Sequence, residues 1–252
     1  MSNPMRIPAG FTQDRPGQPL SLIGVPDPFY NAVFDDDFLY YQSGRYTVTV
    51  TGAGGGAVAG VNGAGGQITL TTATNTPATT DLTAIQTSTA GIPLVAGAKT
   101  AFIARLMLAD VPNPVINVGL IQKTATPFTV SDGIYFNKPT GSTTITAFVV
   151  TGSVVKASVS LAGKFAPVNG QWFDLGFVYN GRDDLMIYAG TNLVGALADP
   201  TSAAATPDAR VLNVASGAML TSAVLAPTLA VQSGTASSKV LTVDFFAAIA
   251  ER

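Results

Sequence analysis

Strand-forming residues greatly outnumber helix-forming ones in this chain, and that imbalance limits what it can fold into. Thr contributes 30 of the 252 residues and Val 25, whereas Glu and Lys together contribute only 7. Glu and Lys usually fill the exposed faces of helices, whereas Thr and Val favour strands, so helices are expected to be few and short. The 26 glycines and 16 prolines add turn signals at intervals too short for long helices. The composition predicts an all-β protein.

Segments of strand composition with turn-rich borders recur along the chain. The clearest is 172–179, where positions 173, 175, 177 and 179 are Phe, Leu, Phe and Tyr, so one face is committed to a core. Asn180 and Gly181 follow, which is a strong hairpin signal. About 10 to 12 such strands without βαβ alternation predict an antiparallel β-sandwich. Further candidate strands lie at 46–50, 67–72, 118–122, 133–137, 143–150, 154–161, 185–189 and 240–246.

Two other segments carry helical signals. Residues 100–109 fit either a helix or a buried strand by periodicity, but their length and the stop at 110–114 favour the strand. Within 203–219, residues 207–212 resemble a capped first turn of a helix. This second region is therefore predicted to contain one short helix.

The first 28 residues differ from the rest, because six of the 16 prolines fall at positions 4, 8, 16, 19, 26 and 28. Prolines this dense block helices and sheet ladders, so residues 1–28 are predicted to form an extended arm before one sandwich domain at 29–252. Its spread apolar side chains suit a strap over its own domain or a neighbouring subunit; a disordered tail is the alternative, although it would be expected to carry more charge. The candidate contact residues are Met5, Ile7, Phe11, Arg15, Leu20 and Leu22.

Missing residue types exclude several functions. The chain has no histidine and no cysteine, which excludes Ser-His-Asp triads, cysteine nucleophiles, thiolate or imidazole metal sites and redox dithiols. Glu251 is the only glutamate beside 14 aspartates, so hydrolases built on paired glutamates are excluded too. Only 11% of residues are charged, without a Lys/Arg cluster, which leaves no electrostatic footprint for nucleic acid or an anionic membrane. No catalytic residue, cofactor or metal is predicted.

The glycine-rich segment 52–66 formally matches a dinucleotide-binding fingerprint at its start. A pyrophosphate site also needs a helix that begins after the fingerprint, and Gly60, Gly63, Gly65 and Gly66 would break that helix. The segment is therefore predicted to be a flexible β-turn loop.

Clustered aspartates and aromatic residues each allow two interpretations. Asp35–Asp37, Asp132 and the pair Asp183–Asp184 have the oxygen ligands that a calcium ion needs, but no EF-hand spacing, so turn roles are favoured. A further, less favoured interpretation is that two of these aspartates act as a general acid and a general base. A second set has the chemistry of a sugar-stacking platform, although core packing is the commoner role. That set is Tyr40, Tyr41, Tyr46, Trp172 and Tyr179.

Several motifs resemble those of known families. The hairpin at 172–190, with its W-x-x-L-x-x-x-Y-x-G strand, is similar to that of concanavalin-like and laminin-G-like jelly rolls. Residues 243–246 resemble the closing strand of those folds, which returns beside the first strand. Over roughly 30–252 the chain also resembles a group of tailed-bacteriophage virion proteins. The stretches that carry this second likeness are 34–41, 65–70, 131–138 and 225–234.

These resemblances imply a function. Such virion proteins decorate or cement the outer face of a capsid. The glycosidases of the jelly-roll superfamily carry two glutamates separated by an aspartate on one strand, and its lectins bind calcium and manganese through a histidine and acidic residues. Neither pattern is present in this chain.

The sequence therefore predicts a non-enzymatic virion structural protein that binds the major capsid protein and forms homo-oligomers, with trimers implied by the resemblance. It is expected on the capsid surface after synthesis in the host cytoplasm, since the N-terminus lacks a signal-peptide core and no apolar run is long enough to span a bilayer. The alternative is a carbohydrate-recognition or host-adsorption module of a head or tail fibre. A third possibility, an enzyme, would need clustered aspartates in a deep pocket.

Overall fold

A computed structural model describes residues 31–52, 54–61, 66–73, 78–88, 91–190, 209–211 and 223–251. The predicted arm, with its six candidate contact residues, lies outside the described residues. All regular structure within them is strand apart from one 3-10 turn, η3 (Ser43–Arg45). No helix in the described part of the chain has the length and apolar character to cross a bilayer. The predicted all-β class is confirmed.

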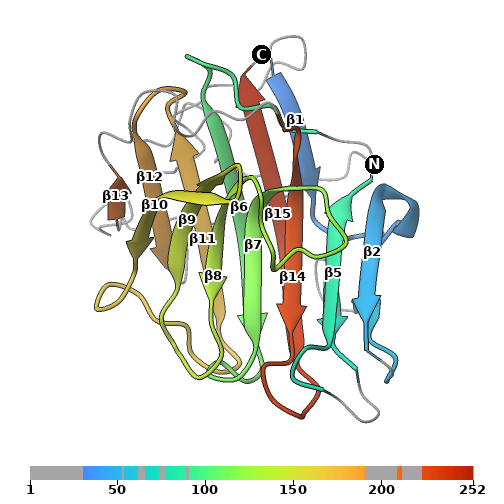
Figure 1. Ribbon diagram of the computed structural model, residues 1–252. Helices are drawn as coiled ribbons and strands as arrows, with labels where there is room; N and C mark the ends of the chain where they lie inside the picture. Colours follow the sequence, from blue (N-terminus) through green and yellow to red (C-terminus); the bar gives the residue numbers. More distant parts are fainter. Residues whose placement is uncertain are drawn as a thin grey trace, which may run out of the picture.

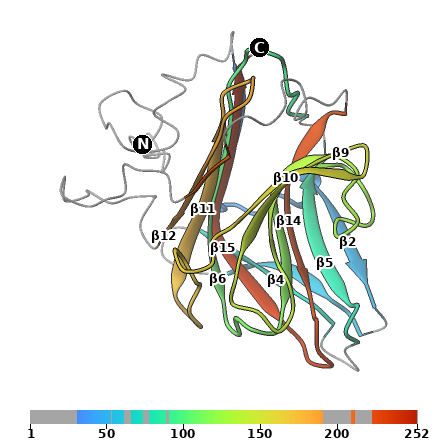
Figure 2. The ribbon, with the colours of Figure 1, turned by 60° about the vertical axis from the view of Figure 1, so that its left-hand side comes forward.

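Two antiparallel sheets lie face to face, as Figure 2 shows. Sheet A has the strand order β13-β12-β11-β6-β15-β4-β3, and β1 also pairs with β15. Its strands are β1 (Asn31–Asp36), β3 (Ala57–Val61), β4 (Gln67–Thr71), β6 (Thr100–Leu108), β11 (Trp172–Tyr179), β12 (Leu185–Gly190), β13 (Ala209–Val211) and β15 (Val240–Glu251).

Sheet B has seven strands in the order β10-β9-β8-β7-β14-β5-β2. Figure 1 looks onto this sheet, with β10 on the left and β2 on the right. Its strands are β2 (Tyr46–Thr51), β5 (Leu82–Thr87), β7 (Val115–Gln122), β8 (Gly133–Lys138), β9 (Thr146–Thr151), β10 (Val154–Ser160) and β14 (Leu225–Gln232).

The 12-residue strand β15 organises sheet A. One of its edges pairs with β6, and the other pairs first with β4 and then with β1, where Asn31 lies opposite Glu251. The last strand therefore returns beside the first, as the resemblance to jelly rolls implied.

Alternate side chains of both sheets fill the space between them. Phe102 of β6 stacks on Phe177 of β11, with ring centroids 5.7 Å apart, and Phe177 contacts Phe136 of β8 at 6.2 Å. All three rings are fully buried, and burying each stabilises the fold by about 1.5–3 kcal/mol. The aromatic contacts hold sheet A against sheet B at the centre of the core.

The predicted hairpin at Asn180 and Gly181 is confirmed. Strands β11 and β12 pair along their length, and Gly181 adopts φ +81° in the connection. The side-chain Oδ1 of Asn180 accepts hydrogen bonds from the backbone N–H groups of Arg182, Asp183 and Asp184 at 2.8–3.1 Å. A single amide side chain thus organises the whole turn.

Several sequence predictions need correction. The predicted helical turn is wrong at Ala209–Val211, which form β13 and pair with the edge of β12. The rest of the predicted helical region 203–219 lies outside the described residues. The segment 52–66 is not only a loop, since Ala57–Val61 form β3 against β4. The described residues form 15 strands, more than the roughly 10 to 12 expected from composition and turn spacing. In the first two cases, pairing with the neighbouring strand overrode the local turn or loop preference.

Candidate functional site

One row of side chains crosses all seven strands of sheet B on the face turned away from the core. Antiparallel register places residues of neighbouring strands directly opposite one another, so they share a face. From β2 to β10 this central row consists of Thr47, Gln86, Thr228, Gly119, Tyr135, Phe148 and Ser158. A second row beside it consists of Thr49, Ala84, Ala230, Asn117, Asn137, Thr146 and Ser160. Hydroxyl, amide and aromatic groups dominate this outer face.

Two aromatic rings lie on the half of this face formed by β8, β9 and β10, which we call the open half. Tyr135 of β8 and Phe148 of β9 stack with their centroids 5.7 Å apart and their planes 26° apart, and both are half-buried. Burial raises the pKa of the Tyr135 phenol, which therefore stays protonated and able to donate a hydrogen bond at neutral pH.

A glycine makes room for this pair. Gly119 lies opposite Tyr135 in the register of β7 and β8. A Cβ atom at position 119 would come within 2.5 Å of Ile134 O and 2.6 Å of Tyr135 Cα. Any larger residue would push β8 away from β7 at the row that carries the aromatic pair.

The β7–β8 loop, residues 123–132, covers the other half of the face and crosses β14 in Figure 1. Phe128 packs against Leu82, Ala84 and Ala230 beneath it. Thr124 N donates to Gln86 Oε1 at 3.0 Å, which fixes the start of the loop. The loop thus forms a wall on the β5 and β14 side, while β8, β9 and β10 remain open.

A ladder of amides connects this wall to the aromatic pair. Asn117 Nδ2 donates to Pro127 O in the loop at 2.9 Å, and Asn137 Nδ2 donates to Asn117 Oδ1 at 2.7 Å and to Ile116 O at 3.3 Å. No donor among the described residues reaches Asn137 Oδ1. The half-buried Asn137 therefore presents a fixed acceptor beside Tyr135.

None of the seven strands of sheet B contains Asp or Glu. Glu251 lies at the end of β15 in sheet A, where its Oε2 accepts a hydrogen bond from Lys99 N at 2.8 Å. The strands of sheet B therefore carry no carboxylate that could take part in hydrolysis by a carboxylate pair. This face offers stacking and neutral hydrogen bonding.

The predicted turn roles of the aspartates are confirmed at several positions. Asp36 Oδ1 accepts from Phe38 N at 2.8 Å, Asp37 Oδ1 from Leu39 N at 3.2 Å, and Asp132 Oδ1 from Gly152 N at 3.1 Å. Asp183 bonds Asn180 Nδ2 in the β11–β12 turn. Across the described ranges, no three His, Cys, Asp or Glu residues converge as a metal site would require.

The five aromatics considered as a sugar platform do not form one exposed platform. Tyr46 and Tyr179 are buried in the core, as the commoner role predicted, and Tyr41 stacks on Tyr46. Tyr40 is 82% exposed. Trp172 lies on the outer face of sheet A, on the other side of the molecule from sheet B, with the Arg105 guanidinium over its ring. Sequence reasoning missed the pair that does face outward, Tyr135 and Phe148. The only local signal was the alternation of 133, 135 and 137 within β8.

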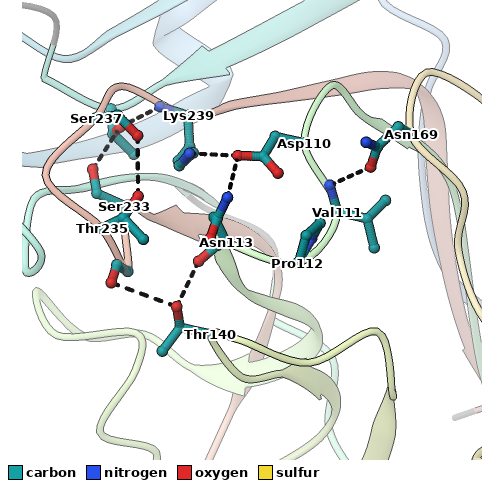
Figure 3. A network of polar contacts seen from close by, with 12 residues as sticks. Asp110, Val111, Pro112, Asn113, Thr140, Asn169, Ser233, Thr235, Ser237 and Lys239 are labelled. Atoms are coloured by element: carbon teal, nitrogen blue, oxygen red, sulfur yellow. Dashed lines mark hydrogen bonds and ion pairs between the residues drawn. The ribbon is translucent and has the colours of Figure 1, made fainter.

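A second polar network joins the loops at one end of the sandwich (Figure 3). Lys239 Nζ lies 2.5 Å from Asp110 Oδ2, which also accepts from Asn113 Nδ2 at 2.7 Å. The hydrogen bond from Lys239 lowers the pKa of Asp110. Thr140 Oγ1 donates to Asn113 O at 2.8 Å. These groups satisfy one another and tie the loops after β6, β8 and β14 together, so this network is structural.

Comparison of the sequence with protein-family models and with curated proteins finds no match. The fold does match solved structures. Arcelin-5, a lectin-like defense protein from Phaseolus vulgaris, aligns with a TM-score of 0.55 at 10% identity, covering 88% of this chain and 99% of that chain. The lectin UEA-II in complex with galactose aligns with a TM-score of 0.56 at 13% identity over 87% and 98% of the two chains.

An endo-1,3-beta-glucanase from Streptomyces sioyaensis also has a TM-score of 0.56 at 13% identity, over 90% of this chain and 98% of that chain. Identities this low establish the fold alone. The fold is an antiparallel jelly-roll β-sandwich like that of concanavalin, as predicted. The finer resemblance to virion proteins stays a prediction.

Proposed function

We propose that this protein is a non-catalytic carbohydrate-recognition module whose binding surface is the open half of the outer face of sheet B. The observation that carries the proposal is the stacked pair Tyr135 and Phe148 beside the acceptor of Asn137, on strands without a carboxylate. Aromatic rings stack against the apolar faces of sugars, while a few fixed polar groups set orientation. The lectin-like fold supports this assignment.

The chemistry of the face favours an uncharged glycan. Its hydroxyl and amide groups match sugar hydroxyls as donors and acceptors. On the seven strands, charged residues are limited to Lys138, which is buried toward the core, and the exposed Lys156 of edge strand β10. The central part of the open half therefore has no charge that would select an acidic sugar.

A panel of immobilised neutral and acidic polysaccharides, followed by titration calorimetry of the hits, tests the proposal. We expect saturable binding to neutral glycans that Tyr135→Ala weakens while the unfolding midpoint stays close to that of the wild type. Absence of binding across the panel would contradict the proposal, and so would binding that the folded Tyr135→Ala variant retains in full.

The role on a virion rests on the sequence resemblance. In that setting the module would be a head or tail fibre component that adsorbs to host polysaccharide, or a capsid decoration protein that binds the major capsid protein as a homo-oligomer. Binding of the purified chain to assembled empty capsids, compared with binding to host polysaccharide, separates the two. Capsid binding that survives Tyr135→Ala would support decoration independently of sugar recognition.

A further inference from the structure

The outer face of sheet A is apolar, unlike that of sheet B. Register places one row of side chains across five strands, from Val33 of β1 through Ile249, Ala101 and Val178 to Met186 of β12. A second row begins at Asp35 of β1, and its remaining members are Ala247, Ile103, Gly176 and Tyr188. Together the rows form a continuous surface that points away from the sandwich core.

These side chains are nevertheless buried. Ile103 is 2% exposed, Val178 1% and Ile249 0%, whereas Val33 at the β1 edge is 39% exposed. They form a cluster separate from the main core, and among the described residues Met186, on the same face, is the only further hydrophobic side chain packed against it. Strands that are apolar on both faces need a covering layer on each.

We propose that residues 1–28 of the same chain form this layer. The described chain begins at Asn31 in β1, directly beside the row that starts at Val33. Crossing from β1 to β12 takes about 20 Å at about 4.8 Å per strand, and 28 extended residues reach about 90 Å. The segment is therefore long enough to cross the face and return. Its dense prolines keep it extended, and Met5, Ile7, Phe11, Leu20 and Leu22 supply apolar groups along it.

A photo-crosslinking experiment on the full-length chain tests the proposal. Because the protein has no cysteine, Met186→Cys carries a single benzophenone maleimide on the outer face of sheet A. Ser158→Cys, exposed on the outer face of sheet B, is the matched control. We expect peptides from residues 1–28 to be crosslinked to position 186 within one chain, and none to position 158. Mixing isotopically labelled and unlabelled copies distinguishes crosslinks within a chain from those between chains.

Crosslinks to residues 191–208, crosslinks between copies, or none to 1–28 would overturn the proposal. A second full-length variant gives an independent readout. Phe11→Asp combined with Leu20→Asp should raise the rate at which the thiol of Met186→Cys reacts with a bulky maleimide by roughly tenfold, by opening the layer locally. The same pair of changes should leave the rate for Ser158→Cys unaltered. An unchanged rate at position 186 contradicts docking. Neither readout depends on glycan binding.

Discussion

Tyr46 of β2 donates its phenolic hydrogen bond to Asp36 Oδ2 of β1, so this contact joins sheet B to sheet A. Arg45 Nη1 lies 3.1 Å from the same oxygen. The rings of Phe34 and Phe38 pack on Phe246 of β15 at 5.0 and 5.6 Å. The aromatic and acidic stretch that contributed to the virion resemblance therefore closes one edge of the sandwich.

Tyr46→Phe should destabilise the fold by about 1–3 kcal/mol, because it removes a hydrogen bond to a charged, buried acceptor while keeping the ring. Urea unfolding at neutral pH measures the change. Tyr40→Phe, at a position 82% exposed, controls for the loss of a phenol. Equal stability of the Tyr46→Phe variant and the wild type would show that the contact with Asp36 contributes nothing.

The same phenol should make the fold sensitive to alkali. Burial and the hydrogen bond to Asp36 raise the pKa of Tyr46 far above its usual value of 10.0. The unfolded chain therefore releases this proton above about pH 10 while the folded chain keeps it, so stability is full below pH 10 and falls as pH rises further. Urea midpoints measured from pH 8 to 11.5 should fall less steeply for Tyr46→Phe than for the wild type. Parallel curves would refute this origin of the pH dependence.

Two glycines with similar backbone angles should respond very differently to alanine. Gly66 and Gly141 have φ +75° and +71°. A Cβ atom at 66 would lie 2.3 Å from Leu39 N and 2.4 Å from Phe38 C, whereas one at 141 meets nothing within 4 Å. Gly141→Ala should cost about 1–2 kcal/mol for the backbone angle alone, and Gly66→Ala about 3 kcal/mol or more because the steric clash adds to it. Thermal unfolding of the two variants measures both losses of stability, and equal losses would rule out the steric clash at position 66.

Lys138 should produce a pH dependence of the opposite sign. Its side chain is fully buried, and Nζ donates to Pro139 O at 3.1 Å and Ser142 O at 3.2 Å. Burial lowers the pKa of Lys138 to about 8, partly offset by the charge of Asp110. Between pH 8 and the usual value of 10.5 the unfolded chain holds more protons, so stability from this group rises with pH.

The stability difference between the wild type and Lys138→Met should therefore shift toward the wild type by on the order of 1 kcal/mol between pH 7.5 and 9.5. Lys156→Met, at an exposed position, controls for the loss of one lysine charge. A pH-independent difference for Lys138→Met would contradict the shifted pKa.

Glycan affinity should depend on the stacked pair. Tyr135→Ala and Phe148→Ala should each weaken binding about tenfold, which corresponds to roughly 1.4 kcal/mol. Tyr135→Phe keeps the stacked ring, so its affinity measures the contribution of the hydroxyl alone. Val48→Ala, at an exposed site on β2 of the same sheet, serves as the matched control and should bind as the wild type does. Titration calorimetry with one neutral glycan measures all four variants, and wild-type affinity in all of them would place the binding surface elsewhere.

Local signals predicted the elements whose residues lie close together in the chain. The Asn180–Gly181 turn formed because one amide side chain satisfies three nearby N–H groups. The segment 100–109 was favoured as a strand by its length and its stop, and β6 at Thr100–Leu108 confirms it. By contrast, β13 and β3 carried turn or loop signals and became strands through pairing with β12 and β4.

Composition and residue identity alone establish the all-β class and exclude chemistry that needs histidine or cysteine, because neither depends on how the strands pack. Alternation along a strand places each side chain on one of two faces, so it also determined that the side chains of Tyr135 and Asn137 share a face. The single row formed by Thr228, Gly119, Tyr135 and Phe148 follows instead from the pairing of strands in the folded sheet. Which strands become neighbours depends on the packing of the whole core, and no local pattern encodes it.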